Sequence, residues 1–270
     1  MKITDPKKTK ILTVVYSFGK GGTERAAQNF ATGYSEIGCD SRILSTKLDG
    51  PRRHYLENWG IPVYFLGNFN NCQEIIDWRP DIVHIHSHGL DPEEFYNIHE
   101  LCPMAKFVET NVFSRPSPWA KQLLISFQLS QWCGWLFAKR SNHKYKSAIL
   151  PNPVDTEAYC RASPERRSSF RSHYGLLETD LIIGRVGQNF EGKWSSILID
   201  VFEEIRAKIN NLKLLLVNPP QSILDRALGS EYSNDIVHIH RIDGDMALVD
   251  CYSSIDVFVL IARQGESFGM

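Results

Sequence analysis

A glycine-rich turn near the N-terminus holds the first residues whose types and spacing could do chemistry. In YSFGKGGTERAAQNF an apolar run ends near Ser17, and Gly21 and Gly22 stand just before a segment expected to be helical. Free N–H groups at a helix start, beside glycines that let a ligand approach the backbone, can bind phosphate. The dinucleotide-binding pattern G-x-G-x-x-G is broken by Glu24, and no P-loop G-K-S/T is present. An anion site and a tight turn without a ligand both remain open.

Two cations in the second half could also face an anion. In IIGRVGQNFEGKW, Arg185 stands at the end of a predicted strand and Lys193 at the start of a predicted helix. A guanidinium and an ammonium placed together suit a diphosphate. Such residues on loops are often only solvated, so this alternative stays open.

Three histidines alternate along one predicted strand and its end. His84, His86 and His88 in VHIHSHG lie at a spacing of two, which could place them on one side of a strand as metal ligands. No carboxylate stands nearby at ligand spacing, so we expect no metal. Contact with a substrate at the strand end and plain packing are the two remaining interpretations.

The last residues, ARQGESFGM, contain a fourth candidate. Residues 256–262 are predicted to form a buried strand, and Glu266 follows it between two glycines. A carboxylate after a core strand, followed by the backbone amides of 267–269, is typical of a ligand loop. A solvated loop glutamate is the alternative.

The elements that must position these residues follow a repeated strand–helix pattern. In the first half, β-branched runs at 11–17, 41–45, 61–66, 81–86, 105–110 and 147–150 alternate with helical stretches near 23–37 and 70–78, and 123–140 is predicted to be a strand leading into a helix. Two prolines around Asn152 predict a linker over 151–163. Helices near 164–176, 194–209, 220–228 and 245–254 and strands at 181–187, 212–217, 235–240 and 256–262 follow. We therefore expect an α/β fold of two doubly wound parallel-sheet domains, 1–152 and 153–270, with a ligand in the cleft between them.

Composition excludes several classes of protein. With 30 Lys and Arg against 31 Asp and Glu, the chain is not built to coat nucleic acid. Its six cysteines show no CxxC spacing, which argues against a disulfide framework or a zinc site. No apolar run approaches the ~20 residues of a membrane helix. We expect a cytoplasmic protein that has no nucleic-acid partner.

One stretch mixes aromatic and basic side chains. WCGWLFAKRSNHKYK brings Trp132 and Trp135 close to Lys139, Arg140 and two further lysines. Such a face could contact anionic lipid or a lipid-linked sugar, at the inner side of a membrane. The plainer alternative, which we favour, is a helix that faces the core and ends in a solvated basic segment.

Taken together and in order, these places make the sequence resemble retaining glycosyltransferases of family 4 along nearly its whole length. The matching pieces are GKGGTER, PDIVHIHSHG, LPNPVDTEAY, GRVGQNFEGKW and DCYSSIDVFVLIARQGESFGM. The resemblance implies the GT-B architecture and transfer of a sugar from a nucleotide-sugar donor to a glycan, lipid-linked or small-molecule acceptor, with retention of configuration. It implies a hexosyl type of transfer and no cofactor, metal included.

The resemblance also assigns roles to residues. The amides of Gly21 and Gly22 would lie near the donor diphosphate, Arg185 and Lys193 would clamp it, and Glu266 would be the first glutamate of a Glu-x7-Glu pair that contacts the donor sugar. Donor-binding candidates further include Ser267, Phe268 and Gly269, and the acceptor-side candidates are His86, His88, Glu109 and Asn111.

Departures from the family pattern are informative. The histidine usual after the strand matching KFVET is missing, so Glu109 or Asn111 would stand in. The spacing from Arg185 to Lys193 is longer than usual, and Trp194 replaces a common glycine. The second glutamate would fall beyond Met270, so we expect a chain cut within its second domain.

Two other functions remain in view. A chain that keeps only part of a donor site could bind a nucleotide-sugar or glycan without turnover. A nicotinamide-dependent dehydrogenase is a third option, which the missing glycine at Glu24 disfavours.

Overall fold

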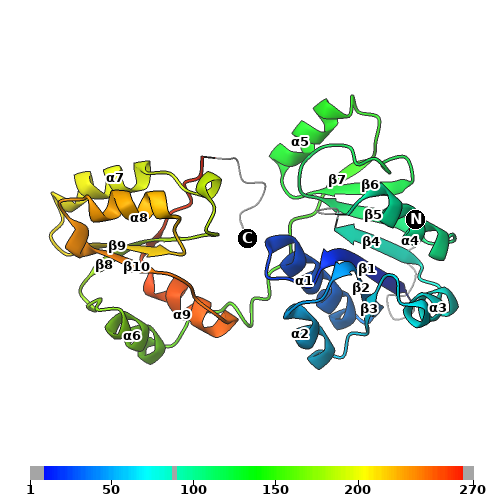
Figure 1. Cartoon of the computed structure of the whole chain (residues 1–270), viewed down its shortest axis with the longest axis horizontal. Helices are drawn as coiled ribbons and strands as arrows, with labels where there is room; N and C mark the ends of the chain where they lie inside the picture. The colour runs from blue at the N-terminus through cyan, green and yellow to red at the C-terminus, as the bar shows by residue number, and fades with distance from the viewer. Residues whose placement is uncertain (1–8, 87–89, 264–270) are drawn as a thin grey trace. The chain divides into compact units, whose positions relative to one another are not determined.

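The chain folds into two compact units that divide between Val154 and Asp155. The structure is a computed structural model that describes residues 9–86 and 90–263. Each unit is a parallel sheet with helices on both faces (Figure 1). The predicted α/β class with two doubly wound sheets is confirmed.

The sheet of unit 1 has seven parallel strands in the order β3-β2-β1-β4-β5-β6-β7. Chain order therefore reverses between β1 and β4, whose carboxyl ends form the kind of edge where α/β sheets bind ligands. Seven strands make up this sheet: β1 Lys10–Ser17, β2 Asp40–Leu48, β3 Val63–Phe65, β4 Ile82–His86, β5 Lys106–Asn111, β6 Leu123–Gln128 and β7 Ser147–Ile149.

Helices on the two faces of this sheet bury separate cores. Helices α1 (Gly22–Glu36) and α2 (Arg52–Asn58) supply Ala27, Ala31 and Leu56 to a cluster on one face. Helices α3 (Phe69–Trp78) and α4 (Pro92–Leu101) supply Ile75 and Phe95 to the larger cluster on the other. Helix α5 (Gln131–Arg140) packs against β6 and β7. The sequence did not predict α2 or α4, although Asp91, Pro92 and Glu94 form a capping box that marks the start of α4.

In the part of unit 2 that the structure describes, the sheet has four strands in the order β10-β9-β8-β11. They are β8 Leu181–Val186, β9 Leu212–Val217, β10 Ile236–Ile239 and β11 Val257–Phe258. Helices α7 (Ile197–Arg206) and α8 (Gln221–Leu228) cover one face, and α6 (Pro164–His173) and α9 (Asp245–Ser254) cover the other (Figure 1). Short 3-10 turns at Glu191–Lys193 and Ser233–Asp235 complete the described elements of this unit.

A buried arginine ties α6 to the rest of unit 2. The guanidinium of Arg171 has no exposed surface and donates to the backbone oxygens of Ser254, Leu177, Glu178 and Asp180, at 2.8 to 3.3 Å. It also forms an ion pair of 2.9 Å with the Asp256 carboxylate. Its positive charge is therefore surrounded by acceptors that replace water.

One predicted element differs in unit 2. Residues 256–262 were expected to form a buried strand, but β11 contains only Val257 and Phe258, and both side chains are exposed. The expectation was wrong because β11 pairs only with β8, at one side of the sheet as far as the structure describes it. A run of apolar residues such as this one is compatible with an edge strand as well as with a central one.

Candidate functional site

The glycine turn of unit 1 lies between β1 and α1, as predicted, but a carboxylate covers it. Gly21 is the N-cap of α1, with φ −66° and ψ 167°. The Ser17 hydroxyl donates to Oε1 of Glu24 at 3.0 Å, and this bond holds the Glu24 side chain back over the turn. A Cβ at Gly21 would meet the Glu24 carboxylate, so a side chain there would push the carboxylate away from the turn. The Glu24 carboxylate therefore lies at the helix start that was a candidate phosphate site.

A buried arginine that the sequence did not single out braces the same turn. Arg52, from α2, donates to the side-chain oxygen of Gln28 at 2.9 Å and to the backbone oxygen of Lys20 at 3.3 Å. Its neighbour Arg53 is exposed and pairs with acidic side chains at the surface. Only the three-dimensional structure separates the two arginines, because nothing in their sequence context does.

The histidines of β4 are buried between the sheet and α1. His84 has no exposed surface, and its two ring nitrogens lie 2.9 Å from the hydroxyls of Tyr34 and Thr110. The His86 ring stands 4.7 Å from the His84 ring, and Phe30 packs against both. His86 is also fully buried, and its nitrogens form no hydrogen bond with a described residue. His86 thus ends β4 as a neutral, packed side chain.

Burial sets the protonation of these histidines. It lowers the pKa of His84 to about 3, because the charged ring would lose its water. Burial and, to a lesser degree, the nearby His84 hold the pKa of His86 well below its ordinary range. Both imidazoles are therefore uncharged at neutral pH, so neither is an imidazolium that could act as a general acid.

Glu109 and Asn111 lie on the opposite face of the sheet, under the segment that follows β5. Oε1 of Glu109 accepts from the Ser126 hydroxyl at 2.7 Å and from the Asn111 amide at 3.0 Å. The Asn111 amide also donates to the backbone oxygen of Arg115, at 2.7 Å. Burial raises the pKa of Glu109, and the bonds from Ser126 and Asn111 oppose that rise. Both acceptor-side candidates are almost fully covered, and their bonds fix the course of the chain after β5.

Arg185 and Lys193 lie close together in unit 2, and the arginine holds the lysine's backbone. The Arg185 side chain is 2% exposed and donates to the backbone oxygens of Val186 at 2.6 Å and Lys193 at 2.8 Å. Its guanidinium lies over the ring of Trp194, 5.2 Å from the centroid. Trp194 in turn donates to the backbone oxygen of Gln188 at 2.8 Å. Arg185 and Trp194 together therefore shape the loop that carries Lys193.

The remaining predicted site residues lie outside the described residues. These are His88 in unit 1 and Glu266, Ser267, Phe268 and Gly269 near the C-terminus. Of the others, Gly21, Gly22, His86, Glu109 and Asn111 belong to unit 1, at or near the carboxyl ends of the adjacent strands β1, β4 and β5. Arg185 and Lys193 belong to unit 2. Within residues 9–86 and 90–263, no group of three or more His, Cys, Asp or Glu side chains could hold a metal ion.

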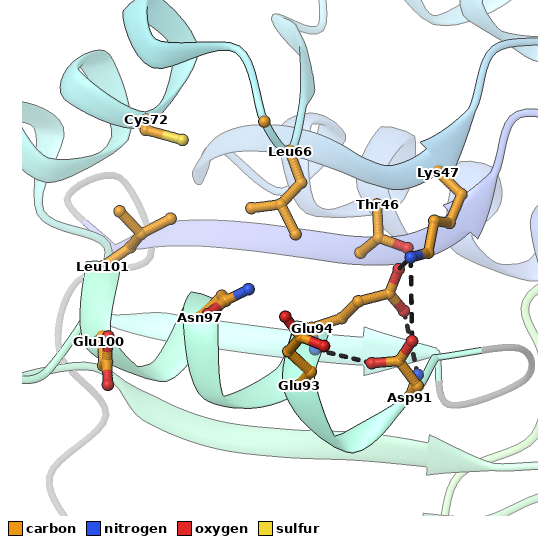
Figure 2. Close-up of a pocket in the computed structure, with 11 residues that line it drawn as sticks. Thr46, Lys47, Leu66, Cys72, Asp91, Glu93, Glu94, Asn97, Glu100 and Leu101 are labelled. Carbon is orange, nitrogen blue, oxygen red and sulfur yellow. Dashed lines mark hydrogen bonds and ion pairs between the residues drawn. The ribbon is translucent and has the colours of Figure 1, made fainter.

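A cavity of about 580 Å³ opens elsewhere in unit 1, between α3 and α4. Figure 2 shows the Lys47 ammonium reaching toward Asp91 and Glu94, which lie 3.9 Å and 3.0 Å away. The Glu94 carboxylate also accepts from the Asp91 backbone N–H, as part of the cap of α4. These charges are thus engaged with one another, and no residue predicted from the sequence to bind a ligand lines this cavity.

Comparison with known proteins rests on structure alone, because no protein-family model and no curated protein matches the chain. HepE of Anabaena, solved with UDP, superposes with a TM-score of 0.73 at 17% identity over 97% of this chain and 76% of its own. A glycosyltransferase of Rickettsia africae gives 0.73 at 17% identity, over 96% of this chain and 74% of its own. The pneumococcal O-GlcNAc transferase GtfA, solved with UDP and GlcNAc, gives 0.68 at 10% identity, over 97% and 80%.

These superpositions run through both units and both parallel sheets. The chain has the GT-B fold. At such low identity the likeness concerns the course of the backbone, and it transfers no residue role. The GT-B fold nevertheless agrees with the topology, since each unit is a Rossmann-like parallel sheet covered on both faces.

Proposed function

We propose that the protein is a glycosyltransferase that moves a sugar from a nucleotide-sugar donor to a glycan, lipid-linked or small-molecule acceptor. The observation that carries the proposal is the GT-B fold, shared with proteins solved in complex with UDP and with UDP-glucose. The family resemblance of the motifs adds retention of configuration and a hexosyl type of transfer. A cytoplasmic location, with contact to the inner face of an anionic membrane, completes the proposal.

The reaction needs negative charge to be stabilised on the leaving diphosphate. Breaking the bond between the anomeric carbon and the phosphate oxygen leaves that charge behind, and fixed donors aimed at it lower the barrier. Lys193 is the cation in unit 2 proposed to meet it, because its backbone is held by the buried Arg185. In this proposal Arg185 acts on the diphosphate in two ways. Its charge attracts the diphosphate, and its hydrogen bonds fix the loop that carries Lys193. These groups would do the work that a metal does elsewhere.

The Gly21 and Gly22 amides are the proposed contribution of unit 1. The Glu24 carboxylate covers this turn in the structure, so a diphosphate reaches the amides only when that side chain turns away. A carboxylate and a phosphate at one helix start repel each other. Glu24 therefore weakens binding of the donor that the turn is proposed to accept.

Titration calorimetry with UDP-glucose, UDP and NAD tests the proposal directly. Binding of UDP and UDP-glucose without binding of NAD is the expected result. Binding of NAD alone would favour the dehydrogenase and overturn it. Release of UDP when an acceptor mixture is added separates transfer from the alternative of a nucleotide-sugar or glycan-binding protein without turnover.

Variants in unit 2 test the assignment of the cations. Lys193→Ala should lower donor turnover by ~100-fold, as loss of one preorganised donor does in other enzymes. Arg185→Ala should lower it at least as much. Lys208→Ala is the matched control, because Lys208 is an exposed lysine of the same unit. Unchanged turnover in Lys193→Ala, with the fold intact by circular dichroism, would remove the lysine from the site.

A variant in unit 1 tests the covered turn. Glu24→Gln removes the negative charge over Gly21, so UDP should bind several-fold more tightly. Glu36→Gln, at the exposed far end of the same helix, should leave UDP affinity unchanged. Equal affinity of both variants and the parent would place the diphosphate away from the Gly21 turn.

A further inference from the structure

Helix α5 exposes its two tryptophans instead of burying them. Cys133 and Phe137 point into unit 1, whereas Trp132 is 63% exposed and Trp135 is 53% exposed. The favoured expectation of a helix that buries its aromatic side chains was therefore wrong for both indoles. Exposing two adjacent tryptophans leaves a large apolar surface in water, which marks an interaction site more often than chance.

The exposed side chains of α5 form a ladder along one side of the helix. The Trp132 and Trp135 rings stack with centroids 4.8 Å apart and planes at 26°. The Lys139 ammonium lies over the Trp135 ring, 5.2 Å from its centroid. Trp132 is one turn before Trp135 and Lys139 is one turn after it, so both neighbours contact the Trp135 ring along one side of the helix. Two exposed indoles with a lysine beside them are a combination that suits the interface of an anionic lipid bilayer.

The stretch of chain that contains the ladder is rich in positive charge. Residues 101–150 contain seven basic side chains, all exposed, and their one acidic residue, Glu109, is fully buried. No ion pair joins any of the seven to a carboxylate in the described part of the chain. The seven are Lys106, Arg115, Lys121, Lys139, Arg140, Lys144 and Lys146. The stretch thus presents positive charge that nothing on its own surface neutralises.

A further exposed aromatic side chain lies near the end of α5. Arg140 donates to the backbone oxygens of Phe113 at 3.0 Å and Ser114 at 3.3 Å, which ties this segment to the helix. Phe113 itself is 56% exposed. Helix α5 packs on β6 and β7, at one side of the seven-stranded sheet (Figure 1). The exposed tryptophans therefore belong to a helix that is held against the sheet.

We propose that the exposed Trp132, Trp135 and Lys139 of α5, with Lys144 and Lys146 in the segment that follows the helix, dock on an anionic lipid bilayer. Indole rings prefer the headgroup region, where their apolar body and N–H group are both satisfied, and lysines beside them meet lipid phosphates. No described helix is long and apolar enough to cross a membrane, so the contact lies in the interface. The inference deepens the proposed function by naming the membrane-side partner, and it does not depend on catalysis.

Sedimentation with vesicles tests the docking. The chain should bind vesicles of equal parts phosphatidylglycerol and phosphatidylcholine, and pure phosphatidylcholine vesicles should bind it at least ~10-fold more weakly, since several lysines each gain about fivefold at an anionic surface. Added salt should release the chain. Equal binding to both vesicles, or none to either, would overturn the proposal.

Two sets of variants locate the face. Trp132→Ala with Trp135→Ala should weaken binding by at least ~10-fold, whereas Trp59→Ala, an exposed tryptophan outside α5, should leave it unchanged. Lys139→Gln, Lys144→Gln and Lys146→Gln together should weaken it by ~100-fold and remove most of its salt dependence. Lys208→Gln, in unit 2, is the control for charge. Arg140 is kept, because it binds the backbone near Phe113. Full binding by both multiple variants would place the contact elsewhere.

Depth of insertion gives a readout that a loss of folding cannot imitate. In a Trp59→Phe background, Trp132 and Trp135 are the exposed indoles among the described residues. Brominated phosphatidylcholine in the anionic vesicles should quench their fluorescence. Binding without quenching, or equal affinity for duplex DNA or an acidic protein, would show a merely electrostatic surface and contradict the proposal. Vesicle binding with no affinity for UDP would sink the proposed function and leave this one standing.

Discussion

The two units share one architecture but bury different kinds of charged group. Unit 1 encloses groups that titrate, namely His84 and His86 on one face of its sheet and Glu109 on the other. Unit 2 encloses two guanidiniums, Arg171 and Arg185, each of which donates to backbone oxygens. Because a guanidinium keeps its charge at any ordinary pH, the two histidines and Glu109 should make the stability of unit 1 depend on pH in a way that the two arginines of unit 2 do not.

The largest expected effect lies in unit 2. Arg171→Ala should cost ~3–5 kcal/mol of unfolding free energy, because four backbone oxygens and the Asp256 carboxylate lose their partner. Urea denaturation followed by hydrogen exchange of β9 amides measures this loss. Arg161→Ala, at an exposed arginine of the same unit, should stay within ~0.5 kcal/mol. A small effect of Arg171→Ala would show that the hydrogen bonds and ion pair of Arg171 contribute little to the free energy of unfolding.

The next effect is the acid sensitivity of unit 1. Unfolded histidines bind protons below their ordinary pKa of 6.5, whereas the folded state holds the pKa of His84 near 3. The stabilisation from His84 is therefore fully present above pH 6.5 and falls as the pH drops toward 3, and the lowered pKa of His86 adds a loss in the same direction. Hydrogen exchange of β4 amides should accelerate in acid before that of β9.

His86→Leu sharpens this test, because His86 forms no hydrogen bond with a described residue. The variant should reduce the acid dependence of unit 1, because the lowered pKa of His86 contributes to it. His173→Gln, on the exposed surface of unit 2, is the control and should not alter the slope. An unchanged slope in His86→Leu would move the acid sensitivity to other groups.

A smaller effect should come from the carboxylate on the other face of the sheet. Ser126→Ala removes the hydroxyl that donates to Glu109 at 2.7 Å, at a cost of ~2 kcal/mol near neutral pH. The raised pKa of Glu109 means that acid protonates it and reduces that cost, so the loss should shrink as the pH falls. Ser147→Ala, on the exposed strand β7, is the control. A loss independent of pH would exclude the carboxylate as its cause.

The smallest contrast concerns helix starts. In unit 1 the side chain of Asp91 caps α4, whereas in unit 2 Ser196 precedes α7 without a side-chain hydrogen bond. Asp91→Ala should cost ~1 kcal/mol, and Ser196→Ala close to nothing. Chemical denaturation measures both. Equal losses would show that the cap of α4 contributes no more than an uncapped serine.

The sequence predicted most of the elements, because strands and helices each produce a local periodicity of apolar residues. The strand runs before Gly19 and before Gly187, and the helices after them, lie where β-branched and amphipathic stretches predicted. Helices α2 and α4 were missed, since α2 is short and the start of α4 depends on a capping box that is easily overlooked. The edge strand β11 was predicted to be a core strand, because apolar residues alone do not show which strands will pair with it.

The candidate site was harder to predict, because side-chain direction depends on tertiary structure. No spacing rule shows that Glu24 folds over Gly21, or that Arg185 points toward the backbone of its own loop. Glu109 and Asn111 were predicted to face an acceptor at the end of a strand, yet both side chains are buried. The placing of Gly21 and Lys193 beside strand ends could be predicted, and their contacts could not. Their proposed roles remain predictions.

The Glu24 carboxylate over the Gly21 turn would compete with any anion that binds at this turn. The Ser17 hydroxyl holds this carboxylate beside the start of α1, where a negative charge is favourable. If the covered arrangement outnumbers the open one by about 100 to 1, the apparent dissociation constant of any anion at the turn rises about 100-fold. Stray phosphate would then be turned away, and only a ligand that gains further contacts would be held.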